Sequence, residues 1–554
     1  MTLIHLIEIQ AEKYPLKRAL IAPVGRDSRQ RRSYAHLTFC QLLERTEALG
    51  SRLEALGVKQ GMKALVFLRP SLDWPAIILA LMRLGVIPVF IDPGMGFKNL
   101  FSAISKMAPE LVICEPVVRW ARFCVPWVFK SVKVWVTSSD TGFWSSQRDG
   151  DVQTKQTALE LKAGDEAAIM FTSGGTGAPK GVLYTHGMFT TQAELVRDMF
   201  ALDEKTIDMS AFPLFSLYTM AFGGTSILPD MDIRRPAAAA PSRLYEQIVD
   251  QGISMISGSP AVWRRLASYC TEKKITLPSL TKVLLFGAPV SLDLHRLFQP
   301  LIPNGDTYTP YGATECLPVS CISGRDILGR YSQKMERGEG TPLGAPFPRT
   351  EISIESLSLS KEGVPPSLEI SPLSSLPSFS VGEIVVKGAQ ASPRYQQEEK
   401  ATQAAKIYEK DFFWHRMGDL GYLDEEGVLW FCGRKVHRVE THLGPLDSIP
   451  CESIFNQHPD VARSALIGLT LPHTDKREPC IVIERKDRRT ELSKQERLHF
   501  KQDLLSLAQK VDRTKDLKTF FLHPAFPVDL RHNIKIDRLA LARYFEAKRD
   551  SHLG

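Results

Sequence analysis

The chain has 554 residues, which is too long for a single hydrophobic core, and its 44% hydrophobic and 24% charged residues are typical of a globular protein. The net charge of +7 is small for this length and the basic residues are dispersed, which argues against nucleic acid as a partner and leaves peripheral association with a membrane surface open. Nine scattered cysteines without a C-x-x-C pair indicate reduced thiols, so we expect a cytoplasmic protein without a secretory signal or a membrane span.

Helices alternate with strands in the first ninety or so residues. Apolar residues recur at helical spacing after Thr2, which can cap the first helix, and the second helix stops at Gly57. In chain order, the pattern predicts helix 3–11, helix 42–56, strand 64–68, helix 75–84 and strand 86–91. Strands that alternate with helices of this length indicate parallel βαβ units.

A glycine-rich stretch, Phe-Thr-Ser-Gly-Gly-Thr-Gly-Ala-Pro-Lys-Gly-Val over 171–182, follows a predicted buried strand at 167–171. Its glycines allow close backbone approach to a polyanion, and its amides, hydroxyls and lysine can bind phosphate oxygens. The predicted phosphate-binding residues are Thr172, Ser173, Gly174, Gly175, Thr176, Gly177 and Lys180. The stretch is not a Walker A loop, because no Gly-Lys-Ser/Thr ends it. Taken alone, such a run is as often a flexible surface loop.

Alternation of helices and strands returns further along. The pattern predicts strand 255–257, helix 260–269, strand 282–286, helix 292–298 and, after a hairpin turn at 424–427, an ordered stretch at 427–434. A Ser/Pro-rich segment at 356–380 interrupts it and indicates a surface insertion or flexible loop. About a fifth of the chain follows residue 434, enough for a small α/β domain.

Four motifs and one lysine accompany the glycine-rich stretch in a fixed order. They are Phe-Gly-Ala-Pro at 286–289, Tyr-Gly-Ala-Thr-Glu at 311–315, the run 414–422, Gly433-Arg434 and Lys535. Together they resemble the adenylate-forming superfamily of acyl-CoA synthetases, luciferases and peptide-synthetase adenylation domains over essentially the whole chain. The resemblance implies an α/β fold, with a large N-terminal domain of mixed α/β layers with parallel sheets and a small, mobile C-terminal α+β domain.

The motifs have physical roles in binding ATP and Mg²⁺, the cofactors that this resemblance implies. Adenine could lie between the small residues Gly287, Ala288 and Pro289 and the aromatic face of Tyr311, which Gly312 follows. Thr314 offers a hydroxyl to a phosphate, and Glu315 a hard oxygen ligand for Mg²⁺. Asp419 can accept both ribose hydroxyls, and the guanidinium of Arg434 suits the nearby ribose or phosphate.

Lys535 is the predicted catalytic cation, together with Thr314 and Glu315 in the catalytic set. A cation at this point would stabilise the negative charge that develops when a carboxylate attacks the α-phosphate. No glycine precedes Lys535, unlike the family pattern, so Lys518 is an alternative. We expect an adenylation domain at 1–434 and a C-terminal domain at 435–554, with the usual hinge carboxylate absent from 435–441.

Local runs resemble the olefin β-lactone synthetases, which activate long-chain β-hydroxy acids. The runs are 91–96 with Lys98 and Asn99, 414–419 leading into 431–441, and 449–452. The resemblance implies AMP-forming activation of a long-chain fatty or β-hydroxy fatty acid to an acyl-adenylate, followed by β-lactone closure, with the acyl chain near the apolar residues 212–218. Two alternatives stay open: a synthetase that transfers the acyl group to CoA or acyl carrier protein, and a non-catalytic acyl- or nucleotide-binding protein.

Overall fold

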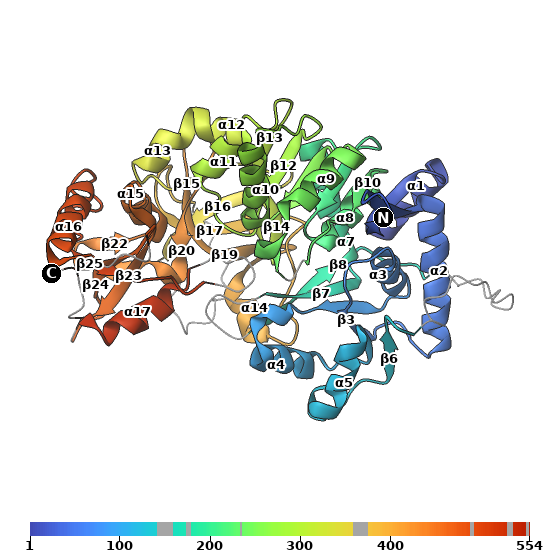
Figure 1. The fold of residues 1–554 in the computed structure, drawn as a ribbon. Coiled ribbons are helices and arrows are strands. Elements are labelled where there is room, and N and C mark those ends of the chain that lie inside the picture. The colour runs from blue at the N-terminus through green and yellow to red at the C-terminus, as the bar shows by residue number, and fades with distance from the viewer. Residues whose placement is uncertain are drawn as a thin grey trace.

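The computed structural model describes residues 1–140, 159–172, 179–232, 235–357, 375–471, 473–487, 492–528, 536–549 and 553. The chain begins at one end of an elongated α/β molecule and ends at the other (Figure 1). Two large sheets with flanking helices form most of it, and two small sheets follow near the C-terminus. The fold class predicted from the sequence is confirmed.

The first two helices form where the sequence predicts them. Helix α1 (Leu3–Lys13) is capped by the Thr2 hydroxyl, which accepts a hydrogen bond from the His5 amide at 3.3 Å. Helix α2 (Phe39–Ala55) begins three residues earlier than predicted, because Thr38 and Gln41 form a capping box before its apolar stripe. The hairpin of β1 (Arg18–Arg26) and β2 (Arg32–Thr38) lies between them.

A six-stranded sheet carries the first predicted βαβ units. Its order is β6-β5-β3-β4-β7-β8, and all neighbours are parallel except β7 and β8. The strands are β3 (Lys63–Phe67), β4 (Ile87–Phe90), β5 (Leu111–Cys114), β6 (Val134–Thr137), β7 (Glu166–Thr172) and β8 (Lys180–Thr185). The helices between them are α3 (Asp73–Arg83), α4 (Phe97–Met107) and α5 (Pro116–Cys124).

A fourteen-stranded sheet forms the centre of the molecule. Its parallel part is β1 with β10 (Thr225–Ile227), β9 (Ile207–Ser210), β11 (Met255–Gly258), β12 (Lys282–Leu285) and β13 (Asp306–Ala313). Antiparallel strands continue it: β14 (Cys316–Ser323), β15 (Thr341–Pro346), β16 (Glu351–Glu355), β17 (Gly382–Lys387), β18 (Lys406–Glu409), β19 (Phe412–Leu423) and β20 (Leu429–Arg434). Its helices are α7 (His186–Phe200), α8 (Ser216–Ala221), α9 (Pro241–Gln251), α10 (Pro260–Lys273), α11 (Leu292–Phe298), α12 (Gly324–Asp326), α13 (Ser332–Glu336) and α14 (Glu399–Ala405).

The predicted hairpin turn joins β19 to β20, where the Asp424 carboxylate accepts hydrogen bonds from the amides of Glu426 and Val428 at 3.0 and 2.9 Å. Most of the Ser/Pro-rich segment, 358–374, lies outside the described residues. Across the described ranges, no helix combines the length and the apolar character that crossing a bilayer requires.

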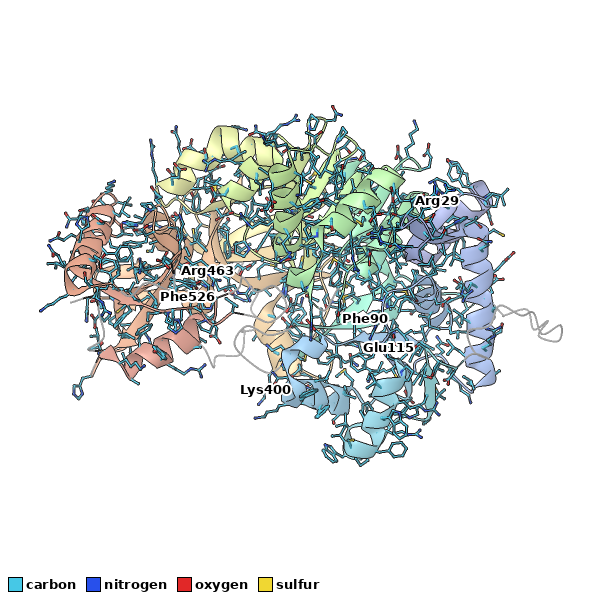
Figure 2. All side chains as sticks on the ribbon, viewed as in Figure 1. Arg29, Phe90, Glu115, Lys400, Arg463 and Phe526 are labelled. Atoms are coloured by element: carbon cyan, nitrogen blue, oxygen red, sulfur yellow. The ribbon has the colours of Figure 1, made fainter. Side chains whose placement is uncertain are left out.

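The chain after Arg434 forms two small sheets of its own, β21-β22 and β23-β24-β25. Their elements are β21 (Val439–Thr441), β22 (Gly444–Leu446), α15 (Ser448–Phe455), β23 (Val461–Thr470), β24 (Arg477–Arg485), α16 (Lys494–Ala508), β25 (Thr519–Leu522) and α17 (Arg538–Glu546). Apolar clusters pack on both faces of the three-stranded sheet. Between β23 and the segment after β25, the Arg463 guanidinium lies 5.5 Å from the ring centroid of Phe526 (Figure 2).

Candidate active site

The glycine-rich stretch joins two antiparallel strands, so it is a hairpin loop at a strand end. Thr172 ends β7 and pairs with Lys180, which begins β8. Five predicted phosphate-binding residues, Ser173, Gly174, Gly175, Thr176 and Gly177, lie outside the described residues. The described ends of the loop, Thr172 and Lys180, therefore lie opposite each other on adjacent strands.

Two tyrosines connect this hairpin to the Thr314–Glu315 turn. The Tyr184 hydroxyl donates to the carbonyl oxygen of Thr314 at 2.6 Å, and the Tyr395 hydroxyl donates to Oε1 of Glu315 at 2.9 Å. Lys180 Nζ lies 5.1 Å from the ring centroid of Tyr395. Burial and the Glu315 carboxylate raise the pKa of Tyr395, so its hydroxyl keeps its proton and acts as a donor. Glu315 thus lies close to one end of the glycine-rich loop.

Tyr311, Asp419 and Arg434 form one hydrogen-bonded set from three strands. The Tyr311 hydroxyl donates to Asp419 Oδ2 at 2.6 Å, and Arg434 Nη1 donates to Asp419 Oδ1 at 2.7 Å. Asp419 and Arg434 are direct partners across β19 and β20. The Asp419 carboxylate raises the pKa of Arg434, and burial together with that carboxylate raises the pKa of Tyr311. The set therefore presents a charged pair beside a neutral phenol.

Gly287 lies at the same sheet edge as this set. β12 pairs in parallel with β13, which carries Tyr311, and Gly287 lies two residues beyond the end of β12. Gly287 has φ +87°, a left-handed conformation that favours glycine. Ala288 and Pro289 follow it in the same loop. The predicted base-binding residues thus stand at the carboxyl ends of adjacent parallel strands, where open α/β sheets bind ligands.

Close packing explains why position 312 is a glycine. A Cβ atom at this position would lie 2.8 Å from Leu317 Cβ and 2.9 Å from the Cys316 carbonyl oxygen, because β13 and β14 come together closely here. The prediction that Gly312 binds nucleotide stays a prediction, and the structure gives this glycine a second role in the turn that presents Thr314 and Glu315.

Aromatic side chains extend from the same edge toward the segment predicted to hold the acyl chain. The ring centroids of Phe212 and Phe215 lie 5.1 Å apart, those of Phe215 and Tyr218 5.5 Å, and those of Phe215 and Phe286 5.3 Å. Phe286 directly precedes Gly287. The apolar surface of 212–218 is therefore continuous with the predicted base-binding loop.

Lys535 lies outside the described residues, but both flanks of its segment are anchored. Val528 and Ile536 form an antiparallel bridge. Arg538 donates two hydrogen bonds, of 2.8 and 2.6 Å, to the buried carboxylate of Glu452 in α15. Lys518, the alternative catalytic lysine, lines a cavity of about 350 Å³ on the small sheet, and the lining residues include none of the site residues named above.

A contact that the sequence did not reveal lies next to Arg434. Lys435 Nζ donates to Oε2 of Glu383 at 3.1 Å, and Arg416 Nη1 donates to the same oxygen at 2.6 Å. Glu383 comes from β17, fifty residues earlier, so no local motif could have indicated it. Lys435 is thus paired with a carboxylate of the large sheet.

Lys406 is buried, and its ammonium interacts electrostatically with Glu315 of the site. Its ammonium donates to the Ser392 carbonyl oxygen, lies 3.1 Å from His415 Nδ1 and 4.4 Å from the ring centroid of Phe413. Burial lowers the pKa of Lys406 to about 8, although Cys316 and Glu315 act in the opposite direction. Burial and Lys406 also lower the pKa of His415, which leaves its ring neutral and able to accept.

Replacing Lys406 by methionine should change how stability depends on pH. Between the pKa of about 8 in the folded chain and the ordinary lysine pKa of 10.5 in the unfolded chain, the unfolded chain binds more protons, so the wild-type free energy of unfolding increases as pH rises through this range. Lys406→Met lacks that increase. Urea unfolding of both proteins should show that the free energy of unfolding of the wild type, relative to that of the variant, is larger at about pH 10 than at about pH 7. A difference that does not change with pH would contradict this.

Among the described residues, no group of three or more His, Cys, Asp or Glu side chains could hold a metal ion. Glu315 is a single carboxylate, and Mg²⁺ in nucleotide sites is held by one or two carboxylates together with phosphate oxygens and water. The donor set therefore fits an ion that arrives with a phosphate ligand.

Comparison with known proteins identifies the class. The AMP-binding enzyme family model matches residues 7–396, and the chain belongs to this family. It is 36% identical to the olefin β-lactone synthetase of Xanthomonas campestris pv. campestris over 545 residues, and this alignment covers 96% of this chain and 95% of that protein. The olefin β-lactone synthetase of Stenotrophomonas maltophilia is 37% identical over 532 residues, or 92% of each chain.

Solved structures share the fold at low sequence identity. O-succinylbenzoate coenzyme A synthetase from Bacillus subtilis, in complex with ATP and magnesium ion, matches with a TM-score of 0.74 and 20% identity over 97% of this chain and 98% of that one. The amide bond synthetase from Marinactinospora thermotolerans matches with a TM-score of 0.77 and 20% identity over 98% and 100%.

Proposed function

We propose that this chain uses ATP to activate a long-chain β-hydroxy carboxylic acid as its acyl-adenylate and then closes the product to a β-lactone. The observation that carries the proposal is the set of Tyr311, Asp419 and Arg434 at the sheet edge that also bears Gly287 and the aromatic segment 212–218. Identity of 36–37% to two olefin β-lactone synthetases over more than nine tenths of the chain supports the second step.

The residues present suit ATP with Mg²⁺. Each oxygen of Asp419 accepts one hydrogen bond within the protein, from Tyr311 or Arg434, and an ionised carboxylate has about four acceptor positions, so capacity remains for two ribose hydroxyls. Glu315 would hold the metal, and the bound Mg²⁺ would neutralise charge on the phosphates. Thr172, Lys180 and the glycine-rich loop between them would surround those phosphates.

In the first step, a carboxylate oxygen of the acid attacks the α-phosphorus, the bond to the bridging oxygen breaks, and pyrophosphate leaves. Lys535 would stabilise the developing negative charge, and Thr314 would hold a phosphate oxygen. In the second step, the substrate's β-hydroxyl oxygen attacks the acyl carbon, AMP leaves with the bonding electrons, and the hydroxyl proton is released. Both reacting groups belong to one molecule, which gives an effective molarity that can reach about 10⁵ M or more.

Products formed from 3-hydroxymyristate and from myristate, each with ATP and Mg²⁺, test this function by mass spectrometry. We expect the β-lactone and AMP from the hydroxy acid without any thiol, and only the adenylate from myristate. If the hydroxy acid is converted only when CoA or acyl carrier protein is present, the enzyme is a thioester-forming ligase and does not form a lactone. Absence of pyrophosphate release with either acid would leave a non-catalytic binding protein.

The Tyr395→Phe variant tests whether Tyr395 positions Glu315. Because a hydrogen bond to a charged group contributes about 1.5–3 kcal/mol, its loss should lower kcat/KM for ATP by roughly tenfold or more. The Mg²⁺ concentration for half-maximal activity should rise as well, since the carboxylate is less fixed, which a merely structural role would not produce. Tyr408→Phe, at an exposed tyrosine of β18, is the control. An unchanged Mg²⁺ dependence in Tyr395→Phe would contradict the assignment.

We also propose a division into domains at 1–434 and 435–554, a cytoplasmic location and peripheral contact with membranes. Support for the division is that every strand after Arg434 belongs to a small separate sheet. Support for the location is that all nine cysteines are free thiols. A long-chain substrate that partitions into bilayers supports the membrane contact.

A further inference from the structure

Helix α5 and the 3-10 turn η2 (Pro126–Val128) form an apolar ridge at the lower edge of the molecule in the view of Figure 1. The inner side of the ridge packs on the protein: Val118, Ala121 and Val125 contact the apolar cluster around β5. Not one residue of α5 is fully buried, although the helix follows directly from an entirely buried strand.

The outer side of the ridge is apolar as well. Val117, Trp120, Phe123 and Trp127 are 73%, 70%, 64% and 62% exposed. Val117, Trp120 and Phe123 are three residues apart, which places them along one side of α5, and Trp127 follows in η2. The rings of Trp120 and Phe123 lie 5.8 Å apart. Single exposed apolar residues are normal on a protein surface, but a contiguous group of this kind marks an interaction site.

The segment that forms the ridge carries only positive charges. Residues 116–134 contain Arg119, Arg122, Lys130 and Lys133 and no aspartate or glutamate. Acidic residues lie at its borders: Glu115 is the N-cap residue of α5, Asp140 lies 3.7 Å from Arg119, and Glu110 lies 3.4 Å from Lys133. Within the described ranges, Arg122 and Lys130 form no ion pair, and the Arg122 guanidinium lies 4.6 Å from the ring centroid of Phe123. Tryptophans flanked by cations are the side chains that suit the boundary between lipid headgroups and acyl chains.

We propose that this ridge docks on an anionic lipid bilayer, with Val117, Trp120, Phe123 and Trp127 entering the boundary layer and the four cations contacting lipid phosphates. At nine residues, α5 can lie in the interface but cannot span it. The segment 116–134 carries four cations and no acidic residue, and two of these cations, Arg122 and Lys130, form no ion pair within the described ranges, which complements anionic lipid. The proposal rests on the proposed function, because docking on a bilayer brings the enzyme to a long-chain acid that is concentrated there.

Cosedimentation of the full chain with extruded vesicles tests the surface. We expect binding to phosphatidylcholine vesicles that contain about one third phosphatidylglycerol, weaker binding at high salt, and little binding to pure phosphatidylcholine. The pair Trp120→Ser with Trp127→Ser should lower the partition coefficient at least about tenfold. The pair Arg119→Gln with Lys130→Gln should lower it by roughly thirtyfold, since each cation near such a surface contributes about 1 kcal/mol.

Lys273→Gln with Lys274→Gln, which removes the same charge from the exposed end of α10, is the matched control and should bind as the wild type does. Equal binding by the ridge variants and this control would overturn the proposal. A concentration-dependent dimer of the wild type that Trp120→Ser abolishes, without vesicle binding, would overturn it in favour of self-association. Pyrophosphate release from detergent-dispersed acid, measured separately on each variant, keeps failure of the enzymatic function distinct from failure of the docking surface.

Discussion

Alanine in place of Lys535 is expected to lower the rate of adenylate formation by roughly 10²–10³-fold or more, the range seen when one preorganised group that stabilises transition-state charge is removed. The additional negative charge on the oxygens of the five-coordinate phosphorus and on the departing pyrophosphate develops only in the transition state. We therefore expect kcat to fall with little change in KM for ATP. Pyrophosphate release under saturating ATP and acid measures this directly.

Two controls make this result specific. Lys518→Ala removes the other candidate cation and should leave pyrophosphate release near the wild-type rate. Supplying the preformed acyl-adenylate to Lys535→Ala should restore product formation, because the lysine acts before the adenylate exists. If Lys518→Ala is the inactive protein and Lys535→Ala is not, the departure from the family pattern around Lys535 marks a true relocation of the catalytic cation.

The helices and strands that periodicity predicted are all present, because periodicity records which side of an element faces the core, but they are a minority of the elements in the chain. The predicted helix at 260–269 is α10, Pro260–Lys273, and the predicted strand at 282–286 is β12, Lys282–Leu285. The ends were less accurate, since a cap decides them: α10 continues to Lys273 and ends at its C-cap residue Lys274, which takes a left-handed conformation with φ +55°. Apolar spacing carries no information about such a terminus.

Side chains that act through long-range contacts were not predictable. Tyr395 reaches Glu315 across eighty positions and Glu383 reaches Lys435 across fifty-two, and neither residue stands in a motif. Tyr311, Asp419 and Arg434 were identified only because each stands in a recognisable run. The structure adds that they bond to one another, which means that Tyr311 is held by its hydroxyl while its ring remains the surface predicted to face adenine.

Asparagine in place of Asp419 is expected to raise KM for ATP roughly 10- to 100-fold. The substitution keeps the shape but removes the charge, and each charge-assisted hydrogen bond to a ribose hydroxyl contributes about 1.5–3 kcal/mol. It also leaves Arg434 without its anionic partner in a site where Asp419 is only 4% exposed. Because these contacts exist before and during the reaction, the loss should appear mainly in KM and less in kcat, as measured by pyrophosphate release at varied ATP.

The β19–β20 hairpin itself supplies the matched control. Asp424 is a second buried carboxylate on these strands, 6% exposed, and it accepts hydrogen bonds from the Val428 amide and from Trp430 Nε1, both at 2.9 Å. Asp424→Asn should therefore lower the thermal stability of the hairpin region and leave KM for ATP unchanged. If Asp419 binds the nucleotide, KM for ATP should rise in Asp419→Asn and not in Asp424→Asn. Equal KM values for Asp419→Asn and the wild type would mean that Tyr311, Asp419 and Arg434 brace the sheet and that the nucleotide binds elsewhere.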